Sequence, residues 1–195
     1  MAKDMLVCEQ TVGQSVYQHG FSVKEHVFQI IDYLSNNSEL DGWKIPKWLD
    51  CYKKQILCST WNKEIITLYT LYHDCGKPYC RTVDLEGKVH FSDHANVSKQ
   101  VWLSVSPENE DSFTVGRLIG EDMFLHTANA TEVKEKLLNS DKRDMITLLI
   151  VALAEIHSNA KLFGGIESTS FKSKWKKLDR RGKQICKHYF GEKNE

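Results

Sequence analysis

Apolar residues recur at helical spacing along most of this chain. From Ser22 onwards they follow one another at intervals that place them on one face of a helix. Ser22 and Glu25 match a capping box, so this helix is predicted to begin at Ser22. The same periodicity predicts further helices after Pro46, over residues 60–74, near Asp93, Ser112 and Thr131, from Asp141 to His157, and over residues 172–187. The expected fold class is all-α, a helical bundle of about seven or eight helices.

One stretch departs from the helical pattern. Gly76 and Pro78 end the helix predicted over residues 60–74. Residues 80–91 then place β-branched residues on both sides of a Leu-Glu-Gly sequence, which is typical of a short hairpin or an extended loop. We therefore expect at most one short hairpin in an otherwise helical protein.

Length and composition favour a single domain. The chain has 195 residues, of which 41% are apolar and 27% are charged, and this is enough for a hydrophobic core. It contains neither an internal repeat nor a low-complexity linker. Its 26 basic and 26 acidic residues balance, which argues against a strongly basic nucleic-acid-binding protein but is compatible with a local basic groove.

The sequence has the features expected of a cytoplasmic protein. No apolar run approaches the roughly 18 residues that a membrane span needs, and the N-terminus is too charged for a secretory signal. The six cysteines form no Cys-x-x-Cys pair, so we expect reduced thiols rather than a zinc ribbon. Cys75 and Cys80 flank the strongest motif, and packing is favoured over metal ligation for both.

Several histidines lie on or at the end of predicted apolar helices: His26, His73, His126 and His157. Any one of them alone is more often a hydrogen-bonded core residue than a metal ligand. A buried polar group without a partner costs about 2 to 7 kcal/mol, and a shared metal ion would satisfy several of them at once. Four histidines in matching positions therefore favour a metal site.

The doublet His73-Asp74 has the chemistry of such a site. Imidazole nitrogen and carboxylate oxygen suit borderline divalent ions, and an ion of this kind lowers the pKa of a bound water to about 7. Lys77 follows three residues later, where its cation could pair with a substrate phosphate. From the spacing alone, a solvated lysine after a helix is an equal alternative.

The sequence from His73 to Pro78, His-Asp-Cys-Gly-Lys-Pro, resembles the signature of the HD phosphohydrolase superfamily. Residues 81–94 look like the HD region of CCA-adding tRNA nucleotidyltransferases, and residues 18–26 resemble the family's first-ligand helix. The resemblance covers about residues 18–160. We therefore expect a single HD domain over residues 1–195, with its core at about 18–160 and a basic C-terminal helical segment at about 168–190. No polymerase motif is present, so CCA transfer is not implied.

Position by position, the resemblance implies that His26, His73 and Asp74 are metal ligands. His94 and His126 match histidines that bind a second metal or the substrate phosphate in some members. Where the family has a last aspartate ligand, this chain has His157. Either His157 replaces that ligand or the site has lost it; we favour replacement, and Glu155 is a weaker substitute because it points about 200° around the helix.

The resulting hypothesis is a phosphohydrolase with one or two divalent transition-metal ions, Fe, Mn, Co, Ni or Zn rather than Mg. A metal-activated water would attack a phosphorylated small molecule such as a nucleotide, a cyclic phosphodiester or the phosphate of an RNA end. Asp74, Lys77, His94 and His126 are the expected catalytic residues. Lys77, Arg81, His94 and His126 are expected to contact the substrate phosphate.

The alternative hypothesis is a degenerate HD domain that binds a nucleotide or RNA without hydrolysis. Two features favour it: the histidine at position 157, and the basic run over residues 172–183, in which Trp175 lies among lysines as on a nucleic-acid surface. An amphipathic terminal helix with a solvated basic face explains the same run and is the simpler interpretation.

Overall fold

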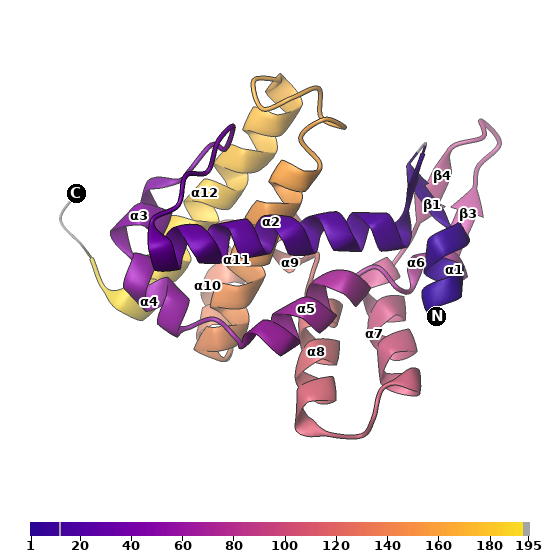
Figure 1. Cartoon of the computed structure of the whole chain (residues 1–195), viewed down its shortest axis with the longest axis horizontal. Coiled ribbons are helices and arrows are strands. Elements are labelled where there is room, and N and C mark those ends of the chain that lie inside the picture. Colours follow the sequence, from indigo (N-terminus) through magenta and orange to yellow (C-terminus); the bar gives the residue numbers. More distant parts are fainter. Residues whose placement is uncertain (12, 193–195) are drawn as a thin grey trace. The chain divides into compact units, whose positions relative to one another are not determined.

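The computed structural model describes residues 1–11 and 13–192, which are mostly helical (Figure 1). The predicted all-α class is confirmed. The first elements are α1 (Ala2–Val7), β1 (Glu9–Thr11), β2 (Gln14–Ser15), α2 (Val16–Asn36), α3 (Lys47–Cys51), α4 (Lys53–Cys58), α5 (Lys63–Tyr72) and α6 (Lys77–Cys80). They are followed by β3 (Arg81–Val83), β4 (Val89–Phe91), α7 (His94–Val105), α8 (Glu110–Gly120), α9 (Phe124–Thr127), α10 (Ala130–Leu137), α11 (Lys142–Ser158) and α12 (Thr169–Phe190).

The described residues contain two hairpins, so the expectation of at most one is wrong. The predicted hairpin is β3–β4, in which Thr82 pairs with His90 and the turn contains Gly87 at a φ of 78°. The unpredicted hairpin is β1–β2, an antiparallel pair of very short strands. Strands of this length carry too few residues for an alternating pattern to be recognised.

The part of the chain that the structure describes also has more helical segments than the seven or eight expected. The region after Pro46 is divided into α3 and α4, and the one-turn helices α6 and α9 lie between longer ones. Short helices of this kind have no full apolar stripe, so periodicity does not reveal them.

Helix α2 begins at Val16, six residues before the predicted start. The amide of Ser15 donates to the Gln18 side chain at 2.8 Å, and the amide of Gln18 donates to the Ser15 hydroxyl at 3.2 Å. This reciprocal pair is a capping box. Ser22 therefore lies inside the helix, and the predicted capping box at Ser22 and Glu25 is wrong.

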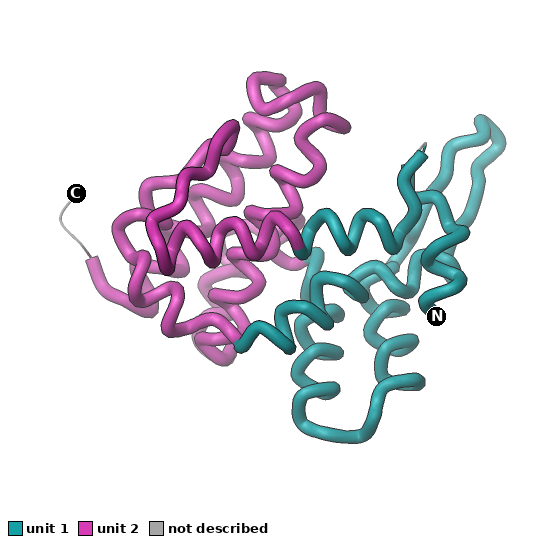
Figure 2. Tube along the Cα trace, viewed as in Figure 1, with its two compact units in different colours: residues 1–24, 62–123 teal, residues 25–61, 124–195 magenta. Residues whose placement is uncertain are grey.

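The chain forms two compact units, each built from two stretches of sequence (Figure 2). Unit 1 comprises Met1–Lys24 and Asn62–Met123, and unit 2 comprises Glu25–Trp61 and Phe124–Glu195. Helix α2 contributes its first part to unit 1 and its remainder to unit 2. A single HD domain over the whole chain stays a prediction.

The core of unit 1 is formed by α5, α7 and α8. Helices α7 and α8 lie side by side in Figure 1, and α8 also packs on α5. The hydroxyl of Tyr69 donates to Asp122 at 2.6 Å, and the indole of Trp102 donates to the carbonyl of Ser112 at 2.9 Å. The large aromatic side chains are thus buried with their polar atoms hydrogen-bonded, as buried Tyr and Trp require.

The core of unit 2 is built around α11, in which every residue from Met145 to Ala154 is buried. Asp141 caps the helix by accepting from the amide of Arg143 at 2.7 Å. Helix α12 packs against α11, α10, α9 and α3. None of the described helices has the combination of length and apolar character that crossing a membrane requires.

Candidate metal centre

Two glycines let separate segments of unit 1 approach the turn that follows α5. A Cβ on Gly20 would lie 2.6 Å from the carbonyl oxygen of Leu71, so the first part of α2 meets α5 backbone to backbone. A Cβ on Gly76 would lie 2.3 Å from the backbone nitrogen of Ser98 in α7. The amide of Gly76 also donates to the Ser98 hydroxyl at 2.8 Å. These contacts bring His19 to the turn and hold the turn on α7.

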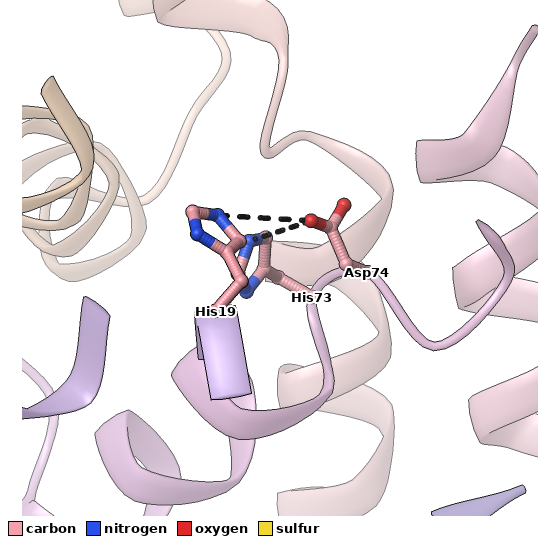
Figure 3. A group of neighbouring side chains, drawn as sticks. All are labelled: His19, His73 and Asp74. Carbon is pink, nitrogen blue, oxygen red and sulfur yellow. Dashed lines mark ion pairs between the residues drawn. The ribbon is translucent and has the colours of Figure 1, made fainter. Parts of the chain in front are cut away.

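His19, His73 and Asp74 form a buried cluster whose side chains point toward one another (Figure 3). Nε2 of His73 lies 3.2 Å from Oδ2 of Asp74, and Nε2 of His19 lies 3.8 Å from the same oxygen. The three residues are exposed by 0%, 1% and 2%. One ligand atom from each lies within 4.8 Å of the other two, so the three groups could bind one cation.

Backbone carbonyls orient the two histidines nearest to the Asp74 carboxylate. Nδ1 of His73 donates to the carbonyl of Thr70 at 2.8 Å, and Nδ1 of His94 donates to that of Phe91 at 3.0 Å. Each ring therefore turns Nε2 toward the carboxylate, at 3.2 Å for His73 and 3.5 Å for His94. In a neutral ring with its proton on Nδ1, Nε2 is an acceptor. Two acceptors attract each other only when a further proton or a cation lies between them.

Lys77 supplies one such positive charge. Its Nζ lies 2.6 Å from Oδ2 of Asp74, and the lysine is only 8% exposed. Burial by itself would raise the pKa of the Asp74 carboxyl, but the Lys77 ammonium and His73 hold that pKa well below its ordinary value. The carboxylate is therefore ionised at neutral pH. The predicted contact of Lys77 with a substrate phosphate stays a prediction.

The donor set fits a divalent transition metal. Oδ1 of Asp74 is buried and accepts no hydrogen bond from the described residues, although an ionised carboxylate normally has several partners. Two imidazole nitrogens and one carboxylate are ligands that borderline ions prefer. A histidine that donates through Nδ1 to a carbonyl, as His73 does, is the usual arrangement of an Nε2 ligand. His19, His73 and Asp74 would hold the ion.

His157, the predicted fourth ligand, has both ring nitrogens occupied within unit 2. Nδ1 donates to the carbonyl of Leu153 at 2.9 Å, and Nε2 accepts from the amide of Lys44 at 3.1 Å. The ring stacks on Trp43, with the centroids 4.1 Å apart. Burial lowers the pKa of His157 to about 4. These contacts describe a neutral core histidine with no ring nitrogen left for a metal, so the expected replacement of the family ligand is not supported.

Two other predicted site residues also lie in unit 2. The ring of His26, the expected first ligand, lies 5.4 Å from that of Trp43. Nε2 of His126 lies 2.8 Å from Oε2 of Glu155, and both side chains are largely buried. The roles of His26 as a ligand and of His126 at the substrate stay predictions. The histidine that unit 1 places beside His73 is His19.

Two remaining candidates near the doublet have distinct surroundings. Arg81 is exposed and lines, with Asp4 and Tyr79, a pocket of about 560 Å³ in unit 1. Burial raises the pKa of the Cys75 thiol to about 12, and its sulfur donates to the carbonyl of Ser98 at 3.3 Å. Cys75 is thus a protonated packing residue, as expected. The role of Arg81 at the substrate stays a prediction.

His19 is the site residue that the sequence analysis missed. The sequence contains two consecutive capping-box patterns, and choosing the one at Ser22 left His19 outside the helix. The pattern from Ser15 to Gln18 is the one that the structure uses. Recognising it would have placed His19 in the first turn of α2, on the same helix as His26.

The chain was compared with known protein families, curated proteins and solved structures. No protein-family model, no curated protein and no solved structure matches the chain.

Proposed function

We propose that this protein is a metal-dependent phosphohydrolase of the HD type, acting on the phosphate of a nucleotide, a cyclic phosphodiester or an RNA end. One observation carries the proposal: three buried ligand groups converge at the His73-Asp74 doublet, with a lysine and a further histidine beside them. Buried titratable groups gathered around a specific charge partner are typical of functional sites.

The residues around the cluster divide the chemistry among them. A divalent ion held by His19, His73 and Asp74 supplies Lewis acidity and lowers the pKa of water. Lys77 brings a positive charge that can stabilise the phosphate as negative charge develops on it. His94 is the more accessible histidine, with its side chain 17% exposed. Its ring is fixed through Nδ1, so a protonated Nε2 can donate to the leaving oxygen.

The ligand composition also limits the metal. Two imidazoles to one carboxylate form a nitrogen-rich set, which favours Fe, Mn, Co, Ni or Zn over Mg, an ion that prefers oxygen ligands. Binding should be lost as the pH falls, because imidazoles must be neutral to coordinate.

Elemental analysis of the purified protein, with assays on one phosphodiester and one phosphomonoester, tests the proposal. We expect one or two transition-metal ions per chain, as about that number is typical of such sites, and turnover that chelation abolishes. With His19 as the ligand in place of His26, His19→Ala should lose both metal and turnover. The matched variant His26→Ala on the same helix should then keep both. If His26→Ala loses the metal and His19→Ala keeps it, the ligand is His26, as the family resemblance implies, and not His19.

A second candidate function, binding without hydrolysis, is favoured by the Lys77 ion pair. An ammonium group 2.6 Å from Asp74 already neutralises the carboxylate that a metal would need. In that case the parent protein would contain no metal, would hydrolyse neither substrate, and would still bind a nucleotide through Lys77 and His94. Metal in the parent protein together with turnover excludes this alternative.

A further inference from the structure

Positive charge is concentrated on α12. The whole chain is neutral, with 26 basic and 26 acidic residues, yet α12 carries a single acidic residue, Asp179. Its basic residues are Lys172, Lys174, Lys176, Lys177, Arg180, Arg181, Lys183 and Lys187. A local excess of this size attracts anions even on a neutral protein.

Some of these cations already have carboxylate partners. Lys172 pairs with Glu167 at 2.7 Å, Lys183 pairs with Asp179 at 3.2 Å, and Lys187 pairs with Glu192. Lys177 and Arg180 differ, because both are exposed and neither has an ion pair within the part of the chain that the structure describes. Their charge is therefore available to a ligand.

The two cations line a pocket of about 360 Å³ within unit 2. Lys177, Arg180, Arg181 and Gln184 follow one another at helical spacing, so they form one wall from a single face of α12. Residues 127–130, from the last residue of α9 to the first residue of α10, form the other wall. The volume falls within the range of pockets that take small molecules.

Arg181 connects α12 to the opposite wall of this pocket. Its guanidinium donates to the carbonyls of Leu125 and Ala128, and the Gln184 amide donates to the carbonyl of Ala130 at 3.1 Å. Burial lowers the pKa of Arg181, and the neighbouring Arg180 lowers it further. An anion between the two arginines would relieve this repulsion.

The lining contains no acidic residue. Glu132 interacts electrostatically with Arg181, but it is held in the α10 capping box, where it accepts from the amide of Asn129 at 2.7 Å. A ligand in the pocket would therefore meet lysine and arginine donors, the groups that best bind phosphate.

The pocket also lacks an aromatic surface for a base. Trp175, which the sequence analysis considered as a nucleic-acid contact, donates through its indole to the carbonyl of Lys44 at 2.7 Å. The Lys44 ammonium lies over the ring, 5.0 Å from its centroid. Trp175 is thus engaged within unit 2 and is absent from the lining, and this favours a compact phosphate ligand over a base-stacked strand.

We propose that the pocket formed by Lys177, Arg180 and Arg181 is a binding site for a small polyphosphate, either inorganic or the phosphate chain of a nucleotide. Lys177 and Arg180 bind the phosphate oxygens. Arg181 keeps α12 against residues 127–130 and adds its charge. This site is composed of residues other than those of the candidate metal centre, so it does not depend on the proposed hydrolysis.

Calorimetric titration of the full chain tests the site. The probes are inorganic tripolyphosphate, ATP and a short single-stranded oligoribonucleotide without terminal phosphates, all in excess chelator so that no metal contributes. We expect tripolyphosphate and ATP to bind with similar affinity. Lys177→Ala and Arg180→Ala should each weaken both by about tenfold, since a charge-assisted hydrogen bond is lost. Lys176→Ala is the matched control, because Lys176 is exposed on α12 but does not line the pocket, and it should change little.

Four results would overturn the proposal. Absence of tripolyphosphate binding would show that the pocket is not a polyphosphate site. An equal effect of Lys176→Ala would show a general attraction to α12 rather than a pocket. Tighter binding of the oligoribonucleotide than of tripolyphosphate, weakened by the same variants, would assign the surface to a nucleic-acid backbone instead. An affinity for ATP far above that for tripolyphosphate would show that the nucleoside, and not the phosphate chain, determines binding.

Discussion

Gly20 and Leu71 are in backbone contact: a Cβ on Gly20 would lie 2.6 Å from the carbonyl oxygen of Leu71. The contact joins two helical segments that are distant in sequence, and it lies directly beside His19 on one helix and close to His73 on the other. A side chain at position 20 would separate the segments, so this contact controls the geometry of the candidate metal centre.

Gly20→Ala should therefore destabilise the protein and weaken metal binding. Alanine in place of a helical glycine ordinarily stabilises by about 0.5 to 1 kcal/mol, but forcing a methyl group against a carbonyl costs about 1 to 3 kcal/mol. We expect a net loss in the free energy of unfolding, measured by urea denaturation. Gly120→Ala is the control, because the atoms nearest to its Cβ would belong to the flexible side chain of Lys99. Equal stability of both variants would contradict the close approach.

Asp74 and Lys77 should show strong energetic coupling in metal-free protein. Asp74→Asn leaves a buried ammonium unpaired, and Lys77→Met leaves a buried carboxylate with only histidines around it. Each change should cost about 3 to 5 kcal/mol, whereas the double variant should cost less than their sum. The exposed pair Lys187 and Glu192 is the reference, with coupling of about 1 kcal/mol or less. Additive single effects would show that the two charges do not stabilise each other.

The stability of the protein should fall as the pH drops from about 6.5 to about 4, because of His157. Its folded-state pKa is about 4, lowered mainly by burial, whereas the ordinary pKa of histidine is 6.5. Within this window the unfolded state binds more protons, so the stabilisation is complete above 6.5 and is lost towards 4. The full effect is about 3 kcal/mol. Protonation would also place an N–H against the Lys44 amide that now donates to Nε2.

Urea denaturation over this pH range, on the parent protein and on His157→Gln, provides the measurement. In the variant, the pH dependence of the unfolding free energy should be smaller by the amount that one titrating proton contributes. His188→Gln changes an exposed histidine on α12 and should keep the parent slope. An unchanged slope in His157→Gln would assign the acid sensitivity to other groups.

The cysteines should differ sharply in reactivity. Burial raises the pKa of Cys75 and of Cys186 to about 12, so both are thiols rather than thiolates at pH values near 8 and react slowly. Cys58 is exposed. Alkylation of the native protein followed by peptide mass spectrometry should label Cys58 first and the two buried cysteines only after denaturation. Labelling of Cys75 as fast as Cys58 in native protein would show that the turn after α5 opens to solvent.

Local patterns were sufficient for several parts of this protein. The apolar periodicity from Asp141 to His157 predicted α11, the central helix of unit 2, and the Leu-Glu-Gly sequence predicted the β3–β4 turn. These features depend on residues close together in sequence, whose preferences are additive and local. The same holds for the His73-Asp74 doublet, whose adjacent residues share one helix end.

Only the tertiary structure decided which histidine accompanies the doublet. His19 and His26 lie seven residues apart on α2, which is two turns and within about 20° of the same face. Helical periodicity therefore cannot distinguish them. The choice depends on the contact of Gly20 with Leu71, which no local pattern encodes.

The basic segment shows the same division. Composition alone indicated a basic terminal helix, and helix propensity with its apolar stripe was enough to predict α12. Which of its cations are neutralised, and which line a pocket, depends on where residues 127–130 and the carboxylates of other segments pack against it. The sequence by itself determined the helices and the types of chemistry available. Long-range packing decided which side chains meet, because those contacts join residues whose separation in sequence carries no periodic signal.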